Sequence, residues 1–147
     1  MPRTPMALAL AATLAACGGE PAPAAAFATG TVCPQGGTPL RYADFQTAFF
    51  GDASGTTGYC NYCHDSSRTT IDARHGAPPQ ATFDLLPVIR AYATKIDALA
   101  GKGPTPTVPT MPYLFPAPKP PGVPDPQPVP TDPERQALSV WLACGAP

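Results

Sequence analysis

The sequence of 147 residues predicts a small all-α domain whose core is completed by something other than its own side chains. Three stretches place apolar residues at helical spacing, and no stretch shows the alternating pattern of a strand. Fewer than one residue in five is Leu, Ile, Val or Phe, which is below the level typical of a self-sufficient core. A group that is not polypeptide is therefore expected to supply the missing apolar surface.

The first 16 residues have the features of a signal peptide: a cation at Arg3, a short apolar stretch and then small residues. Residues 14–17 (LAAC) resemble the lipobox of bacterial lipoproteins, in which the cysteine, here Cys17, becomes the lipidated first residue. Gly18 is not the aspartate of an inner-membrane retention signal. We therefore expect a lipid anchor in the cell envelope, at the outer membrane facing the periplasm. Ordinary secretion with cleavage nearby is the alternative.

Residues 17–32 are small, rich in Pro and Ala and without periodicity, so they are expected to form a flexible tether. The domain proper is expected to span residues 33–147. The chain carries a net charge of −1 and contains no run of Lys or Arg. It therefore lacks the basic surface that binding to nucleic acid requires, and that class of partner is excluded.

The first predicted helix begins near Thr38, which can cap it, with Pro39 at the first helical position. Gly51 is expected to end it. Its apolar residues recur at roughly helical spacing: Leu40, Tyr42, Phe45 and Phe49.

The second predicted helix starts at Asp84 and is closed by Gly101 and Gly103. Its apolar positions recur at three- and four-residue steps: Leu85, Val88, Ile89, Tyr92, Ile96 and Leu99. Residues 104–133 follow, with 13 prolines in 30 positions, which excludes a helix and any central strand. By composition alone this segment could be a disordered linker.

The third predicted helix begins at Thr131, which has capping-box spacing to Glu134. Leu138, Trp141 and Leu142 then fall on one side, and Gly145 is expected to stop the helix.

The segment 60–64 (CNYCH) has the spacing by which two thiols attach to the vinyl groups of haem while the adjacent imidazole binds iron. We therefore predict one covalent haem c, held by Cys60, Cys63 and His64. Two other sites use similar residues. A thioredoxin-type dithiol would require a βαβ context, and a zinc site would require further ligands, such as His75 or a distant cysteine.

A second axial ligand of the iron is expected from Met111, since Met1 and Met6 would leave with the signal peptide. Met111 stands in the proline-rich segment, where prolines restrict the chain before it binds and reduce the entropy lost. That segment would then cover the haem. His75 is the alternative, and bis-histidine ligation would give a lower reduction potential.

At these residues the chain resembles the single-haem, class I c-type cytochromes of the bacterial lipoprotein kind, from Cys33 to the C-terminus. The resemblance implies a small helical domain wrapped around one covalent haem, with a long Pro-rich loop. Cys60, Cys63, His64 and Met111 correspond to the haem-binding residues of the family. Other expectations also come from the resemblance: the Pro78 carbonyl accepts a hydrogen bond from the proximal histidine, and an aromatic residue of the last helix packs across the first helix. The loop at 51–58 departs from the family, which puts packing of Phe49 and Phe50 on haem in question.

Aromatic side chains are expected to supplement the core around the haem: Tyr59, Tyr62, Tyr113 and Trp141. Tyr113 and Phe115 follow Met111 directly, and we expect them to line the same pocket or to serve in ordinary packing.

The expected function is one-electron transfer in the periplasm, without catalysis, by a monomer or a subunit of a redox complex. The partner would be another redox protein, which the sequence does not identify. Two alternatives remain: a haem peroxidase or gas sensor whose iron is open or bis-histidine ligated, and a haem subunit of a larger oxidoreductase.

Five cysteines are present, and this interpretation assigns Cys17 to lipid and Cys60 and Cys63 to haem. Exported proteins seldom leave two thiols free, so parity predicts a disulfide between Cys33 and Cys144. The resemblance permits the pairing, because the first and last helices cross in that family.

Overall fold

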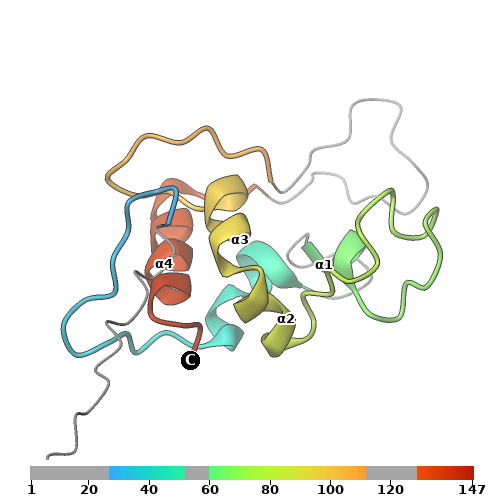
Figure 1. Cartoon of the computed structure of the whole chain (residues 1–147), viewed down its shortest axis with the longest axis horizontal. Helices are drawn as coiled ribbons and strands as arrows, with labels where there is room; N and C mark the ends of the chain where they lie inside the picture. The colour runs from blue at the N-terminus through green and yellow to red at the C-terminus, as the bar shows by residue number, and fades with distance from the viewer. Residues whose placement is uncertain (1–26, 52–59, 112–128) are drawn as a thin grey trace, which may run out of the picture.

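The computed structural model describes residues 27–51, 60–111 and 129–147, and every regular element in these ranges is helical, as predicted. In Figure 1, α4 and α1 lie on opposite sides of α3, and α3 packs against α4. The elements in chain order are the 3₁₀ helix η1 (Tyr42–Phe45), the π-helix η2 (Gln46–Phe50), and the α-helices α1 (Cys60–His64), α2 (Leu86–Ala91), α3 (Ala93–Ala100) and α4 (Asp132–Ala143).

The first predicted helix is wrong in its start and in its type. Helical structure begins at Tyr42, and the Thr38 hydroxyl accepts only a local bond from the Leu40 amide, at 3.2 Å. The end at Gly51 is confirmed, with a positive φ of 60°. The π-helical turn Gln46–Phe50 ends with two neighbouring aromatic residues, Phe49 and Phe50, and both are fully buried.

Trp141 of α4 lies at the centre of the aromatic core. Its ring centroid is 4.9 Å from Phe45 and 6.0 Å from Phe50, and its side chain is fully buried. The Tyr42 ring lies 6.5 Å away on the same side. Such offset and edge contacts between rings add to the free energy gained by burying apolar surface. The last helix therefore packs across η1 and η2 through one aromatic residue.

The second predicted helix is interrupted at Tyr92, which separates α2 from α3. The backbone of Tyr92 leaves the helical region, with φ −101° and ψ 6°. Its amide still donates to the Val88 carbonyl at 3.0 Å, and its own carbonyl accepts from Ile96 at 2.9 Å. The chain thus bends at Tyr92 while the amide and the carbonyl of this residue keep hydrogen bonds to α2 and α3. The ring of Tyr92 meets Phe83 edge-on, with centroids 6.1 Å apart.

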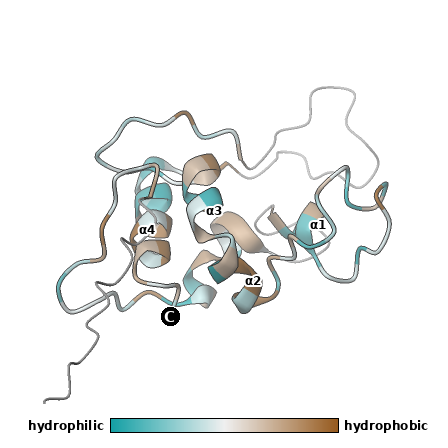
Figure 2. Ribbon diagram, in the orientation of Figure 1, coloured by the Kyte–Doolittle hydropathy of each residue, from teal (hydrophilic) through white to brown (hydrophobic). Residues whose placement is uncertain are grey.

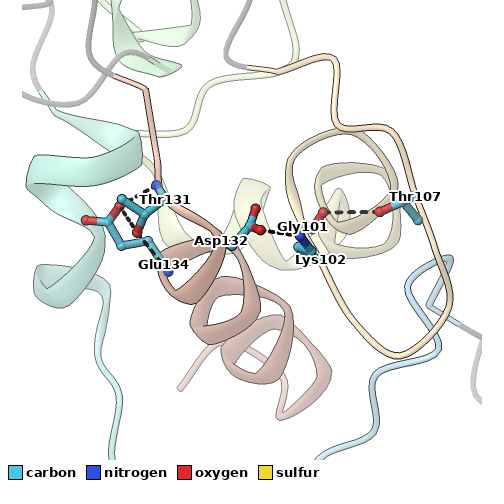
Figure 3. Close-up of polar contacts among 6 residues, drawn as sticks. All are labelled: Gly101, Lys102, Thr107, Thr131, Asp132 and Glu134. Atoms are coloured by element: carbon cyan, nitrogen blue, oxygen red, sulfur yellow. Dashed lines mark hydrogen bonds and ion pairs between the residues drawn. The ribbon is translucent and has the colours of Figure 1, made fainter.

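The prediction for the last helix is confirmed at both ends. The Thr131 side chain accepts from the Glu134 amide, and Glu134 accepts from the Thr131 amide at 2.6 Å (Figure 3). At the other end Gly145 adopts a φ of 83°. Figure 2 shows α4 hydrophilic in its first turns and hydrophobic in its last turns. The hydrophobic part carries the three predicted core residues, all buried: Leu138, Trp141 and Leu142.

The last part of the predicted tether packs with the domain. Thr29 is fully buried, and its amide and hydroxyl both donate to the carboxylate of Asp97 in α3, at 3.0 and 2.9 Å. Its carbonyl accepts from the Thr105 amide at 2.8 Å. These bonds satisfy a buried carboxylate that would otherwise be costly. The folded region therefore includes residues from Phe27 onward, rather than starting at Cys33.

A disulfide joins Cys33 to Cys144, in agreement with the predicted pairing, with the two Cα atoms 4.7 Å apart. It connects the segment leading into η1 with the end of α4 and spans a sequence separation of 111 residues.

Reduction of this disulfide is expected to lower the thermal stability of the protein without changing its visible absorption. The chain-entropy estimate of the stabilisation from closing a loop of this length is about 4.7 kcal/mol. Peptide mapping without reductant, followed by thermal unfolding with and without reductant, measures both parts. Two alkylatable thiols at Cys33 and Cys144 in the exported protein would contradict the prediction.

Several expectations fall outside the described residues: the signal peptide with Cys17, the position of Tyr59, and the proposed pocket residues Tyr113 and Phe115. Within the described ranges, no helix has both the length and the apolar character needed to cross a membrane.

Candidate functional site

A cavity of about 630 Å³ lies between α1, the loop 65–81 and α3. It gathers every residue that the sequence analysis proposed as a haem or iron ligand: Cys60, Cys63, His64, His75 and Met111. Its remaining walls are largely apolar and include Ala81, Phe83, Ile96, Leu99 and Ala100. Residues far apart in the sequence thus meet at one concave surface.

The two cysteines and the histidine of the five-residue helix α1 lie on one face of the helix. Residues separated by three and four positions share a helix face, so Cys60, Cys63 and His64 all line the cavity. The two residues between the cysteines, Asn61 and Tyr62, are buried on the other side, at 2% and 4% exposure. The Asn61 side-chain amide donates to the Gly51 carbonyl at 3.3 Å. The helix is therefore held from behind while its reactive face borders the cavity.

His64 is oriented by two contacts. Its Nδ1 atom lies 2.8 Å from the Ala81 carbonyl oxygen, and its ring stacks on Phe83 with centroids 4.4 Å apart. A carbonyl only accepts hydrogen bonds, so this contact requires the proton on Nδ1 and leaves the lone pair of Nε2 available to a metal. The expectation that Pro78 supplies this carbonyl is wrong, because the oxygen beside Nδ1 belongs to Ala81, whereas the Pro78 oxygen accepts from Arg74 at 2.7 Å.

The surroundings of His64 favour the neutral imidazole. Burial lowers its pKa, the hydrogen bond to Ala81 opposes this shift, and the positive charge of Arg74 lowers the pKa further. A neutral imidazole is the form that binds metals.

The two thiols of α1 are free and uncharged. Burial raises the pKa of Cys60 to about 12, with a further contribution from Cys63. Burial also raises the pKa of Cys63, although the nearby Arg68 and Arg74 oppose the shift. A reactive dithiol of the thioredoxin type depends on a lowered thiol pKa. The surroundings of these cysteines work in the opposite direction.

The backbone amide and carbonyl of Met111 are both anchored by hydrogen bonds. Its amide donates to the Leu99 carbonyl at 2.9 Å, and its carbonyl accepts from Nη1 of Arg135 at 2.7 Å. The same Arg135 nitrogen donates to the Ala100 carbonyl at 2.7 Å. Arg135 therefore ties the proline-rich segment to the end of α3 at the position where Met111 reaches the cavity.

Replacing Arg135 by leucine is expected to destabilise the protein by about 1 to 3 kcal/mol, because two carbonyls lose a charged donor in a buried place. Gln136→Leu is the matched control, since Gln136 is the exposed next residue of α4 and its change should stay within about 0.5 kcal/mol. Urea unfolding of the full chain measures both. Equal midpoints for the two variants would contradict this role.

His75 also lines the cavity, but its ring is engaged elsewhere. It stacks on Tyr62, with centroids 5.0 Å apart and planes 13° apart, and its backbone adopts a φ of 50°. Met111, in contrast, lines the cavity from a segment that is anchored by backbone hydrogen bonds. At the same cavity, the His75 ring is held by stacking and Met111 by its backbone hydrogen bonds.

Three functional contributions were missed in the sequence: the Ala81 carbonyl, Arg135 and Lys95, whose side chain lines the cavity. Every residue has a backbone carbonyl, so the residue type does not show which carbonyl contacts a side chain. Arg135 did leave a signal, since it precedes Leu138 by three positions and Leu142 by seven and so shares their buried face.

Within residues 27–51, 60–111 and 129–147, no group of three or more His, Cys, Asp or Glu side chains is arranged to hold a metal ion. These ranges therefore contain no set of side chains that could form the zinc site considered in the sequence analysis. Comparison of the chain with models of protein families, with curated proteins and with solved structures found no match.

Proposed function

We propose that this protein is a c-type cytochrome that carries single electrons in the bacterial cell envelope. Cys60 and Cys63 bind one haem covalently, and His64 and Met111 are the axial ligands of its iron. Cys17 anchors the protein by lipid at the outer membrane, and the exchange partner is another redox protein. The proposal assigns no catalysis to the site.

The observation that carries this proposal is the convergence of four residues on one cavity. Cys60, Cys63 and His64 lie on one face of α1, and Met111 reaches the same cavity from an anchored segment. Packing of Trp141 across η1 and η2 is a further point of agreement with the class I cytochrome fold.

The cavity has the properties that a haem requires. Its volume falls within the range of about 300 to 1,000 Å³ that is usual for sites of cofactors and small molecules. Phe83, Ile96 and Leu99 offer apolar surface to a flat, apolar ring. The exposed Lys95 supplies a cation for the carboxylates of the group.

When bound, haem would supply an iron that takes up and releases one electron, with Cys60, Cys63, His64 and Met111 as the residues that would hold the group. The side chains of this protein hold and insulate that centre. The thiols of Cys60 and Cys63 form the covalent links, and the Ala81 carbonyl keeps the His64 proton on Nδ1. The anchored backbone of Met111 limits the freedom of its thioether, and the apolar walls exclude water. Because little has to rearrange, the arrangement suits electron transfer.

The test is production of the full chain in a bacterial host with and without cytochrome-maturation machinery. With the machinery, we expect an intact mass increased by one haem and a visible spectrum of six-coordinate haem; without it, neither. No added mass in the presence of the machinery would overturn the proposal. Tight binding of carbon monoxide by the reduced wild-type protein would instead support a gas sensor, because it requires an open coordination position.

A further inference from the structure

Arg74 is a buried cation in the loop that walls the cavity. Its residue is 3% exposed, and the ion pairs of the described residues do not include it. All five N–H donors of its guanidinium are used, and every acceptor is a backbone carbonyl. These carbonyls, with donor–acceptor distances of 2.7 to 3.3 Å, belong to Asp65, Arg68, Ala77, Pro78 and Ala81.

One of these carbonyls also orients His64. The Ala81 oxygen accepts from Nη2 of Arg74 at 2.7 Å and lies 2.8 Å from Nδ1 of His64. A carbonyl oxygen has two lone pairs, so this pair of donors uses both. A charge-assisted bond is stronger than a neutral one, and Arg74 therefore determines where the shared oxygen lies.

We propose that Arg74 is the positioning residue of the haem site: through the Ala81 carbonyl it orients His64 and raises the reduction potential. This inference rests on the proposed function. It adds that the redox property is set in part by a side chain of the loop 65–81 that does not itself bind the iron.

The sign of the effect follows from two contributions that agree. The guanidinium draws electron density from the Ala81 oxygen, so that oxygen pulls less on the His64 Nδ1 proton and the imidazole is a weaker donor to iron. The buried positive charge also disfavours the oxidised state, which carries one more positive charge than the reduced state. Both contributions raise the potential, and removal of Arg74 lowers it.

The test is the midpoint potential of the haem-loaded full chain carrying Arg74→Gln, Arg74→Lys or the control Arg68→Gln. Arg68 is a cation of the same loop whose Nη1 donates to the Ala73 carbonyl at 2.9 Å and whose guanidinium lies over the Tyr62 ring, 4.8 Å from its centroid. For Arg74→Gln we expect the oxidation equilibrium to move at least tenfold toward the oxidised state, about 59 mV for one electron. Arg74→Lys, which keeps the charge but not the fork, should fall between wild type and Arg74→Gln. Arg68→Gln should shift less than Arg74→Gln.

A second measurement separates positioning from charge and does not depend on the glutamine variant folding. Proton NMR of the reduced wild-type protein should show the His64 Nδ1 proton exchanging slowly with solvent, and exchange should be at least tenfold faster in Arg74→Lys. Equal exchange in these two proteins, or equal potentials for Arg74→Gln and wild type, would overturn the inference. So would equal shifts in Arg74→Gln and Arg68→Gln. Absence of haem from the wild-type protein would instead refute the proposed function itself.

Discussion

The double variant Cys60→Ala, Cys63→Ala is expected to contain no covalently bound haem when it is produced in a host with cytochrome-maturation machinery. The two thiols line the cavity from one face of α1, three positions apart, and no other cysteine of the described residues lines it. Removing both leaves no atom to form a thioether. Extraction with acid solvent should release any residual pigment from the variant and none from the wild type. Intact mass provides the second readout.

The matched control is the double variant Cys33→Ala, Cys144→Ala, which also removes two cysteines but takes them from the disulfide. It should keep its haem through acid extraction and lose only stability. Covalent haem in the Cys60, Cys63 variant, or loss of haem from the control alone, would refute the assignment of the thiols.

Met111→Ala is expected to remove the weak long-wavelength band of sulfur-ligated ferric haem and to lower the reduction potential. Methionine–histidine ligation raises the potential, so loss of the thioether shifts the oxidation equilibrium toward the oxidised state, by more than tenfold or about 59 mV. The segment should stay in place, because it is held by backbone bonds to Leu99 and Arg135. Visible spectroscopy and redox titration measure the two effects.

Two control variants accompany this experiment. Val108→Ala alters an 87% exposed residue of the same segment and should change neither the band nor the potential. His75→Ala removes the rival imidazole and should keep the six-coordinate spectrum. Loss of six-coordination in His75→Ala but not in Met111→Ala would show that the histidine is the ligand.

Features confined to one turn of chain could be predicted from the sequence. The start of α4 depends on Thr131 and Glu134, which are three positions apart, and its end depends on Gly145. The helix at 60–64 was not among the three predicted, so the shared face of Cys60, Cys63 and His64 is known only from the structure. Parity of the cysteines predicted the pairing of Cys33 with Cys144 without any geometry. The ends of α4 and the disulfide could be predicted because they depend on residues close together in the sequence or, for the disulfide, on the number of cysteines.

Features that depend on packing between distant segments could not be predicted. The expected α-helix at 39–50 begins only at Tyr42, as a 3₁₀ helix, and continues as a π-helix whose Phe49 and Phe50 are buried in the core that contains Trp141. The tether becomes part of the domain at Thr29 because Asp97 lies in reach, 68 positions away.

The candidate haem ligands could therefore be identified from the sequence itself, since CNYCH and the single downstream methionine are local patterns. Only the tertiary structure decided which carbonyl orients His64, because the carbonyls of Pro78 and Ala81 accept hydrogen bonds equally and differ only in position. It also decided that Arg74 is buried: an arginine can be solvated at the surface or surrounded by five carbonyls, and only the fold of the loop 65–81 brings those oxygens together.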